Sequence, residues 1–249
     1  MAFIEYENRK INYIDKGEGK TVLIIHGNSV SQKMHKNLMN KLARSFRVIS
    51  LDLPGHGKSE RLENWPVDFW YEHAKAVNKL ICDLVLDDVS LLGYSGGALV
   101  ALNCGLEFPG RISKIIADSF EGTEADETFA GNVEEDRASD KKKLLARLFW
   151  RMMHGKDWEA VVDADTNMTA EHFRLIRTFF HKELKELEIP VLMTGSRGDE
   201  YISDFQKIYD DMKSKLPGSE YTIYEKGKHP ACLTVGRQYI EDVTEFINS

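Results

Sequence analysis

A chain of 249 residues is long enough for one sizeable α/β domain with an insertion, and short for two full domains. Its hydrophobic fraction of 42% and charged fraction of 29% are those of an ordinary globular protein, which excludes the disordered and fibrous classes. A formal net charge of -7 argues against a nucleic-acid binder, because contact with phosphates needs clustered Lys and Arg.

The N-terminal residues form neither a basic segment nor a long apolar one, so we expect no signal peptide. No stretch approaches the roughly 18 apolar residues that a membrane span needs. The three cysteines, Cys82, Cys104 and Cys232, are odd in number and far apart, which is typical of reduced thiols. We therefore predict a cytoplasmic location.

The predicted elements alternate between strand and helix along most of the chain. Alternating residues over 2–15 predict two short strands with a turn at Asn8-Arg9. Apolar runs predict further strands at 22–25, 48–51, 89–94, 112–117, 191–194 and 221–224. Helical patterns end near residue 45 and cover 66–86, 96–107, 203–216 and 235–247. The alternation predicts an α/β fold with a doubly wound, mostly parallel sheet.

Residues 121–187 break this alternation. The segment is charged, lacks strand-like runs and carries aromatic residues at helical spacing: Phe149, Trp150, Trp158, Phe173, Phe179 and Phe180. We predict a helical cap inserted into an α/β core made of residues 1–120 and 188–249. The aromatic residues suggest either an apolar substrate or packing within the cap.

A candidate nucleophile lies between the strand at 89–94 and the helix from 96. Gly93-Tyr94-Ser95-Gly96-Gly97 has the Gly-x-Ser-x-Gly pattern of a sharp strand-to-helix turn. Such a turn strains the nucleophile's backbone and places its hydroxyl at a helix N-terminus, where N–H groups stabilise negative charge. Ser95 is therefore the predicted attacking group.

A serine hydroxyl needs a general base, and the base needs an orienting carboxylate. His229 follows the last predicted strand, where the fold returns a histidine to the carboxyl edge of the sheet. Asp199 follows the strand at 191–194 and completes the order Ser, Asp, His. Glu200 beside it and Asp118 at the end of an earlier strand stay open as alternative acids.

Two backbone N–H groups are predicted to hold the oxyanion. Gly96, directly after the nucleophile, supplies one. The loop His26-Gly27-Asn28 supplies the other, from Asn28, while His26 braces the loop. We find no closely spaced His, Cys and carboxylate cluster and no dinucleotide fingerprint, so neither a metal nor another cofactor is expected.

Together these residues resemble the α/β-hydrolase superfamily, with residues 121–187 in the place of its variable helical cap. The resemblance is closest to serine carboxylesterases and extends in part to the valacyclovir-hydrolase type. Those amino-acid ester hydrolases have an acidic residue directly after the nucleophile, where this chain has Gly96. The matching segments are His26-Gly27-Asn28, Asp52-Leu53-Pro54-Gly55-His56-Gly57-Lys58-Ser59, Gly93 to Gly97, Asp199 and Gly227-Lys228-His229.

The resemblance implies hydrolysis of a small carboxylic ester through an acyl-enzyme on Ser95. The same triad cleaves carbon–carbon bonds and amides in other members, and also supports acyl transfer or perhydrolysis. A non-catalytic ligand-binding module is the alternative from a different class. The expected partner is a small-molecule substrate, and the sequence gives no oligomeric state.

Overall fold

The computed structural model describes residues 2–124 and 129–249. Within them one eight-stranded sheet has the order β1-β2-β4-β3-β5-β6-β7-β8. Strands β3 to β8 pair in parallel, while β1 and β2 form an antiparallel hairpin on the β4 edge. The strands are β1 (Ala2–Tyr6), β2 (Arg9–Lys16), β3 (Thr21–Ile25), β4 (Arg47–Leu51), β5 (Val89–Tyr94), β6 (Ile112–Asp118), β7 (Val191–Ser196) and β8 (Ser219–Tyr224).

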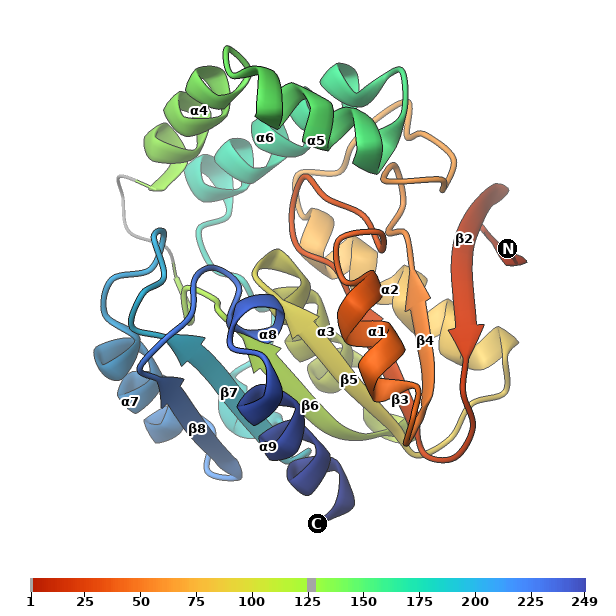
Figure 1. Ribbon diagram of the computed structural model, residues 1–249, viewed down its shortest axis with the longest axis vertical. Helices are drawn as coiled ribbons and strands as arrows, with labels where there is room; N and C mark the ends of the chain where they lie inside the picture. The colour runs from red at the N-terminus through yellow and green to blue at the C-terminus, as the bar shows by residue number, and fades with distance from the viewer. Residues whose placement is uncertain (1, 125–128) are drawn as a thin grey trace.

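Helices cover both faces of this sheet. The strands alternate: Leu23 and Ile25 pack in the core on one face with α2, α3 and α7, whereas Val22 and Ile24 pack on the other with α1 and α9 (Figure 1). The prediction of a doubly wound, mostly parallel sheet is therefore confirmed. The helices are α1 (Lys36–Leu42), α2 (Phe69–Asp83), α3 (Gly96–Glu107), α4 (Phe129–Asp140), α5 (Leu144–His154), α6 (Trp158–Leu175), α7 (Phe205–Lys215), α8 (Ala231–Thr234) and α9 (Arg237–Asn248).

Some element boundaries differ from the predicted ones. The first turn is Glu7-Asn8, not Asn8-Arg9, because both residues adopt positive φ and Arg9 already begins β2. Helix α2 ends at Asp83 instead of continuing to 86, since Val85 takes a left-handed conformation with φ 49°. The short helix α8 precedes α9 and was not predicted.

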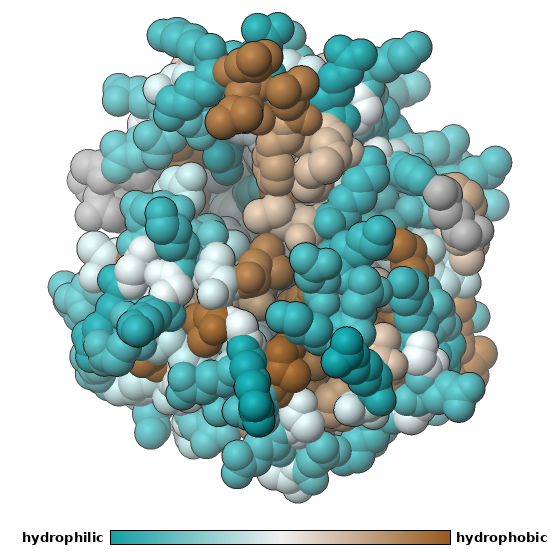
Figure 2. Space-filling view, viewed as in Figure 1, coloured by the Kyte–Doolittle hydropathy of each residue, from teal (hydrophilic) through white to brown (hydrophobic). Residues whose placement is uncertain are grey.

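Helices α4, α5 and α6 follow β6 and precede β7 in the sequence. They lie over one end of the sheet (Figure 1). We call them the cap helices; the predicted limits of the insertion, 121 and 187, stay a prediction. Figure 2 shows hydrophobic residues gathered at the top of the molecule, where the cap helices lie. Helix α5 exposes Leu144, Leu145, Leu148 and Met152.

None of the helices described is long and apolar enough to cross a lipid bilayer. The cysteines are free; Cys104 and Cys232 are buried and Cys82 is exposed. The reduced state of the thiols and the cytoplasmic location stay predictions.

Candidate active site

Ser95 lies at the junction of β5 and α3 in a strained backbone conformation, with φ 53° and ψ -132°. Gly93 and Gly97 must be glycines because other backbone atoms lie where a Cβ would stand. A Cβ at Gly93 would lie 2.0 Å from the carbonyl oxygen of Gly97, and a Cβ at Gly97 would lie 2.4 Å from that of Ile25. Ser95 is partly exposed although its neighbours are buried, so the turn lifts this one side chain out of the core.

A cavity of about 500 Å³ opens at Ser95, beneath the cap helices. Its volume lies in the range typical of small-molecule sites. The lining residues include Ser95, Gly96, Asn28 and His229, which come from three separate segments of the chain. The structure therefore brings these predicted site residues to one cavity. Phe149, Trp150 and Phe173 of the cap helices also line it, and they pack against the same hydrophobic clusters that contain Trp158 and Phe179.

Asp199 is the carboxylate that is hydrogen-bonded to the His229 ring. Its Oδ2 lies 2.8 Å from His229 Nδ1, and its side chain is fully buried. Its Oδ1 accepts hydrogen bonds from the backbone N–H groups of Tyr201 and Ile202 at 2.9 and 3.0 Å, which fixes the plane of the carboxylate. The pair has the geometry that an orienting acid and a base require.

The two alternative acids make other contacts. Glu200 Oε2 accepts from the backbone N–H of His229 at 3.1 Å and does not bind the ring. Asp118 is buried and accepts from Thr194 Oγ1 at 2.6 Å and from the Cys232 N–H at 3.0 Å. Burial raises the pKa of Asp118 to about 6. Neither carboxylate forms a hydrogen bond to the His229 ring.

The electrostatics favour a proton on His229. Burial of the ring alone would lower its pKa, but the hydrogen bond and charge of Asp199, with the charges of Glu121 and Asp118, outweigh burial. The pKa of His229 therefore lies above its ordinary value of 6.5. A raised pKa stabilises the imidazolium that forms when the ring accepts a proton.

Gly96 and Asn28 meet where the oxyanion hole is predicted. Gly96 is the first residue of α3, so its N–H belongs to the first helical turn, whose donors have no acceptor within the helix. A Cβ at position 96 would lie 1.7 Å from Asn28 Oδ1. This contact explains why the chain has no side chain after the nucleophile: the Asn28 side chain fills that space. Asn28 is itself held by Trp70 Nε1 and Thr169 Oγ1, at 3.1 and 2.8 Å.

The histidines other than His229 make structural contacts. His26 accepts a hydrogen bond from the Leu53 N–H at 3.0 Å, which ties its loop to the segment after β4, as expected. His35 and His73 are buried, and burial lowers the pKa of each to about 3. His154 is buried as well, with its pKa lowered to about 4. His181 is exposed and contacts Asp68.

The charge of the cavity was not predicted from the sequence. Glu121, three residues beyond β6, lines it and acts on the pKa of His229. Its position after a parallel strand was the signal that could have identified it. Arg137 is the one Lys or Arg among the described residues that line the cavity. The carboxylates that line it are Glu121, Glu135, Asp136, Asp140, Asp165 and Glu200.

Over residues 2–124 and 129–249, no group of three or more His, Cys, Asp or Glu side chains is arranged to hold a metal ion.

Comparisons with known proteins identify the family of the chain. The sequence model described as the alpha/beta hydrolase fold matches residues 20–146. An uncharacterized hydrolase of Saccharomyces cerevisiae is 31% identical over 117 residues, which are 46% of this chain and 40% of that protein. Haloalkane dehalogenase 2 of Mycobacterium bovis is 28% identical over 110 residues, 43% of this chain and 37% of that protein. The chain thus matches less than half the length of these relatives.

Solved structures match over nearly the whole chain. An esterase from Exiguobacterium antarcticum has a TM-score of 0.79 at 20% identity, covering 99% of each chain. A meta-cleavage product hydrolase from Pseudomonas fluorescens IP01 has a TM-score of 0.77 at 21% identity, covering 100% of this chain and 97% of the other. At these identities the likeness concerns the fold.

Proposed function

Because the chain belongs to the α/β-hydrolase fold family, we propose that it is a serine hydrolase that cleaves a small carboxylic ester through an acyl-enzyme on Ser95. The observation that carries the proposal is one cavity lined by both a strained serine and a histidine already bound to a buried carboxylate. This is the combination that converts an unreactive hydroxyl into a nucleophile.

In the proposed reaction His229 accepts the Ser95 proton through Nε2 while the serine oxygen attacks the ester carbonyl. Nδ1 keeps its own proton, which it donates to Asp199 at 2.8 Å. The imidazolium then gives its Nε2 proton to the leaving alcohol, and the acyl group stays on Ser95. A water molecule, deprotonated by the same ring, releases the carboxylic acid and restores the serine.

The tetrahedral intermediate carries a negative oxygen, which the N–H groups of Gly96 and Asn28 are proposed to bind. One such donor contributes about 3–4 kcal/mol to transition-state stabilisation in comparable enzymes. The residue at the strand-to-helix turn around position 95, which we call the elbow, also decides the type of chemistry. An aspartate there would form an ester with an alkyl group by displacement, whereas Ser95 forms an ester with an acyl group.

Hydrolysis of p-nitrophenyl acetate, butyrate and octanoate tests the proposal, with fluorophosphonate labelling in parallel. We expect the wild type to hydrolyse at least one ester and to be labelled, and Ser95→Ala to lose both properties. Ser45→Ala is the matched control, since Ser45 is exposed on the loop after α1 and lies outside the cavity. A folded wild type that neither hydrolyses these esters nor is labelled would contradict the esterase proposal.

A further inference from the structure

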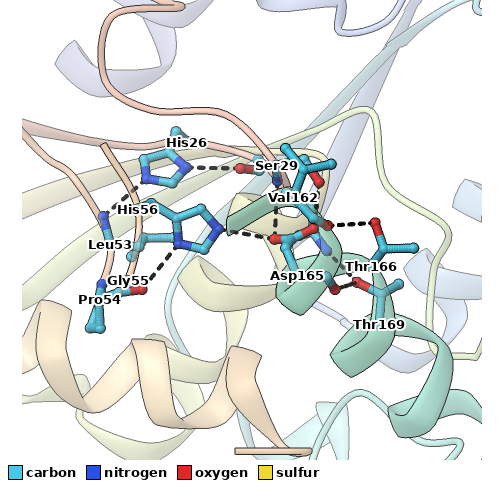
Figure 3. Close-up of polar contacts among 12 residues, drawn as sticks. His26, Ser29, Leu53, Pro54, Gly55, His56, Val162, Asp165, Thr166 and Thr169 are labelled. Carbon is cyan, nitrogen blue, oxygen red and sulfur yellow. Dashed lines mark hydrogen bonds and ion pairs between the residues drawn. The ribbon is translucent and has the colours of Figure 1, made fainter. Parts of the chain in front are cut away.

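Ser29, next to the proposed oxyanion donor Asn28, is bonded to the cap helices through each of its polar groups. Its N–H and its hydroxyl donate to the two oxygens of Asp165, at 3.0 and 2.6 Å. Its carbonyl oxygen lies 3.0 Å from His154 Nε2. Asp165 belongs to α6 and His154 to α5, and both are buried. Figure 3 shows the carboxylate of Asp165 reaching across to Ser29.

The proton positions in this network follow from the partners. His154 Nδ1 accepts from the Gly57 N–H at 3.1 Å, so the proton of this neutral ring lies on Nε2 and is donated to Ser29. His56 contacts the Pro54 carbonyl through Nδ1 and Asp165 through Nε2, each at 3.0 Å. Both partners of His56 are hydrogen-bond acceptors, so its ring is held between the Pro54 carbonyl and the Asp165 carboxylate.

The bonds to Ser29 hold a conformation that the loop would not adopt alone. Ser29 has φ 56°, in the left-handed region that residues with a side chain rarely enter. Such strain persists only where surrounding contacts over-determine it, and it is typical of functional loops. Thr169, one turn after Asp165 on α6, adds a fourth contact by accepting from the Asn28 side chain at 2.8 Å.

We propose that Asp165 is a positioning residue for the oxyanion hole: from the cap it fixes Ser29, and through Ser29 it aims the N–H of Asn28 at the reacting carbonyl. This inference rests on the proposed function, because it assigns a role within that reaction. It gives the cap helices a part in the chemical step as well as in covering the cavity.

The substitution Asp165→Asn tests the proposal with little change of shape. An amide has one acceptor oxygen where the carboxylate has two, so it cannot satisfy the two donors of Ser29 and the His56 ring together. We expect kcat for the best p-nitrophenyl ester to fall about 10- to 100-fold, because loss of one oxyanion donor costs about 10²–10³-fold and displacement costs part of that. KM should change by less than about threefold, since the ground-state ester makes no oxyanion contact.

A second readout separates positioning from general loosening of the cap. A trifluoromethyl ketone forms a tetrahedral oxyanion on Ser95, so its affinity should fall by about the same factor as kcat/KM. Asp157→Asn is the matched control. Asp157 lies at the N-terminus of α6 and joins the cap to the core through Arg61 at 2.6 Å, yet it does not contact Ser29 or Asn28. Its kcat should stay within about twofold of wild type.

A wild type that hydrolyses no ester refutes the proposed function and this inference with it. A wild type that is active, with a folded Asp165→Asn variant that keeps its kcat and its ketone affinity, refutes the inference alone. An equal loss in Asp157→Asn also refutes it, because cap attachment in general would then be the cause. If Asp165→Asn does not fold, Thr169→Val and Ser29→Ala each remove one contact and are held to the same kcat, KM and ketone criteria, with a kcat loss of about 3- to 10-fold expected.

Discussion

Asp199→Asn is the substitution that tests the orientation of His229 most directly. Asp199 Oδ1 accepts from two backbone N–H groups, those of Tyr201 and Ile202, and only its Oδ2 faces the ring. In the variant the amide oxygen takes the position with two donors, and the NH₂ group is turned towards His229 Nδ1. The ring must then accept at Nδ1 and carry its proton on Nε2, so it cannot take the proton of Ser95.

The size of the effect follows from the stabilising free energy that the competent tautomer of His229, with its proton on Nδ1, would lose in the variant. Placing N–H against N–H leaves a buried donor without an acceptor, at about 1–3 kcal/mol, and removes a charge-assisted hydrogen bond worth about 1.5–3 kcal/mol. Because each 1.36 kcal/mol is a factor of ten in rate, kcat should fall about 10²- to 10⁴-fold. KM should change little, since Asp199 does not line the cavity.

Steady-state hydrolysis of a p-nitrophenyl ester between pH 5 and 9 measures both kcat and the acid limb of kcat/KM. Activity needs neutral His229, so it rises with pH through the pKa of that ring. Asp199 raises this pKa, and in the variant the limb should therefore move to lower pH. Glu200→Gln is the matched control and should keep kcat within about threefold. The reasoning is refuted if Glu200→Gln loses the activity and Asp199→Asn keeps it within about fivefold.

Three further predictions concern the same cavity and the core beneath it. Gly96→Ala should lower kcat more than about 100-fold in a folded protein, because its Cβ would lie 1.7 Å from Asn28 Oδ1; an activity within fivefold of wild type would contradict this. The carboxylates of the cavity should favour a choline ester over its neutral 3,3-dimethylbutyl analogue by about tenfold in kcat/KM at low salt, and 0.5 M NaCl should reduce the ratio; equal values would exclude an electrostatic preference. His73 has a pKa of about 3, so between about pH 3 and 6.5 the folded state binds fewer protons than the unfolded chain, and stability falls as pH falls through this window. This group should remove about 2 kcal/mol between pH 7 and pH 5, measured by urea unfolding, and His73→Leu should flatten the dependence by that amount; parallel profiles would count against the assignment.

The sheet and the elbow could be predicted because their signals are local. Apolar runs gave the parallel strands, and α3 spans 96–107 as predicted, since Gly96 begins the helix directly after the strained Ser95. Strand and helix meet there within a few residues, so backbone sterics alone restrict what can stand at Gly93 and Gly97. Nothing from distant parts of the chain is needed to recognise this turn.

The sequence favoured Asp199 as the acid but left Glu200 and Asp118 open as alternatives, for a physical reason. Asp199 and Glu200 are adjacent, and either side chain could reach a histidine in some loop conformation. The decisive contacts are the N–H groups of Tyr201 and Ile202, which fold back onto Asp199 Oδ1. A hydrogen bond over two or three residues in an irregular loop has no periodic pattern that reports it.

The cap was predictable as helices but not as a set of contacts. Asp165 stands in Asp163-Ala164-Asp165, which on composition alone is typical of a solvated helix face, yet it is 2% exposed and binds across to the core. Thr169 was likewise not distinguishable from a surface residue. Helical periodicity states which residues share a face, but not what that face meets.

The nucleophile and the proposed oxyanion hole therefore depend on different levels of folding. Ser95 is strained by its immediate neighbours, whereas the bonds between Ser29 and Asp165 join residues 136 positions apart. Contacts of such separation form only when the cap has docked, because closing the intervening chain costs entropy that the docked interface must offset. A loosened cap would leave the elbow intact and disturb the N–H of Asn28. Its effect should then be larger on the formation of an oxyanion than on the binding of the ester.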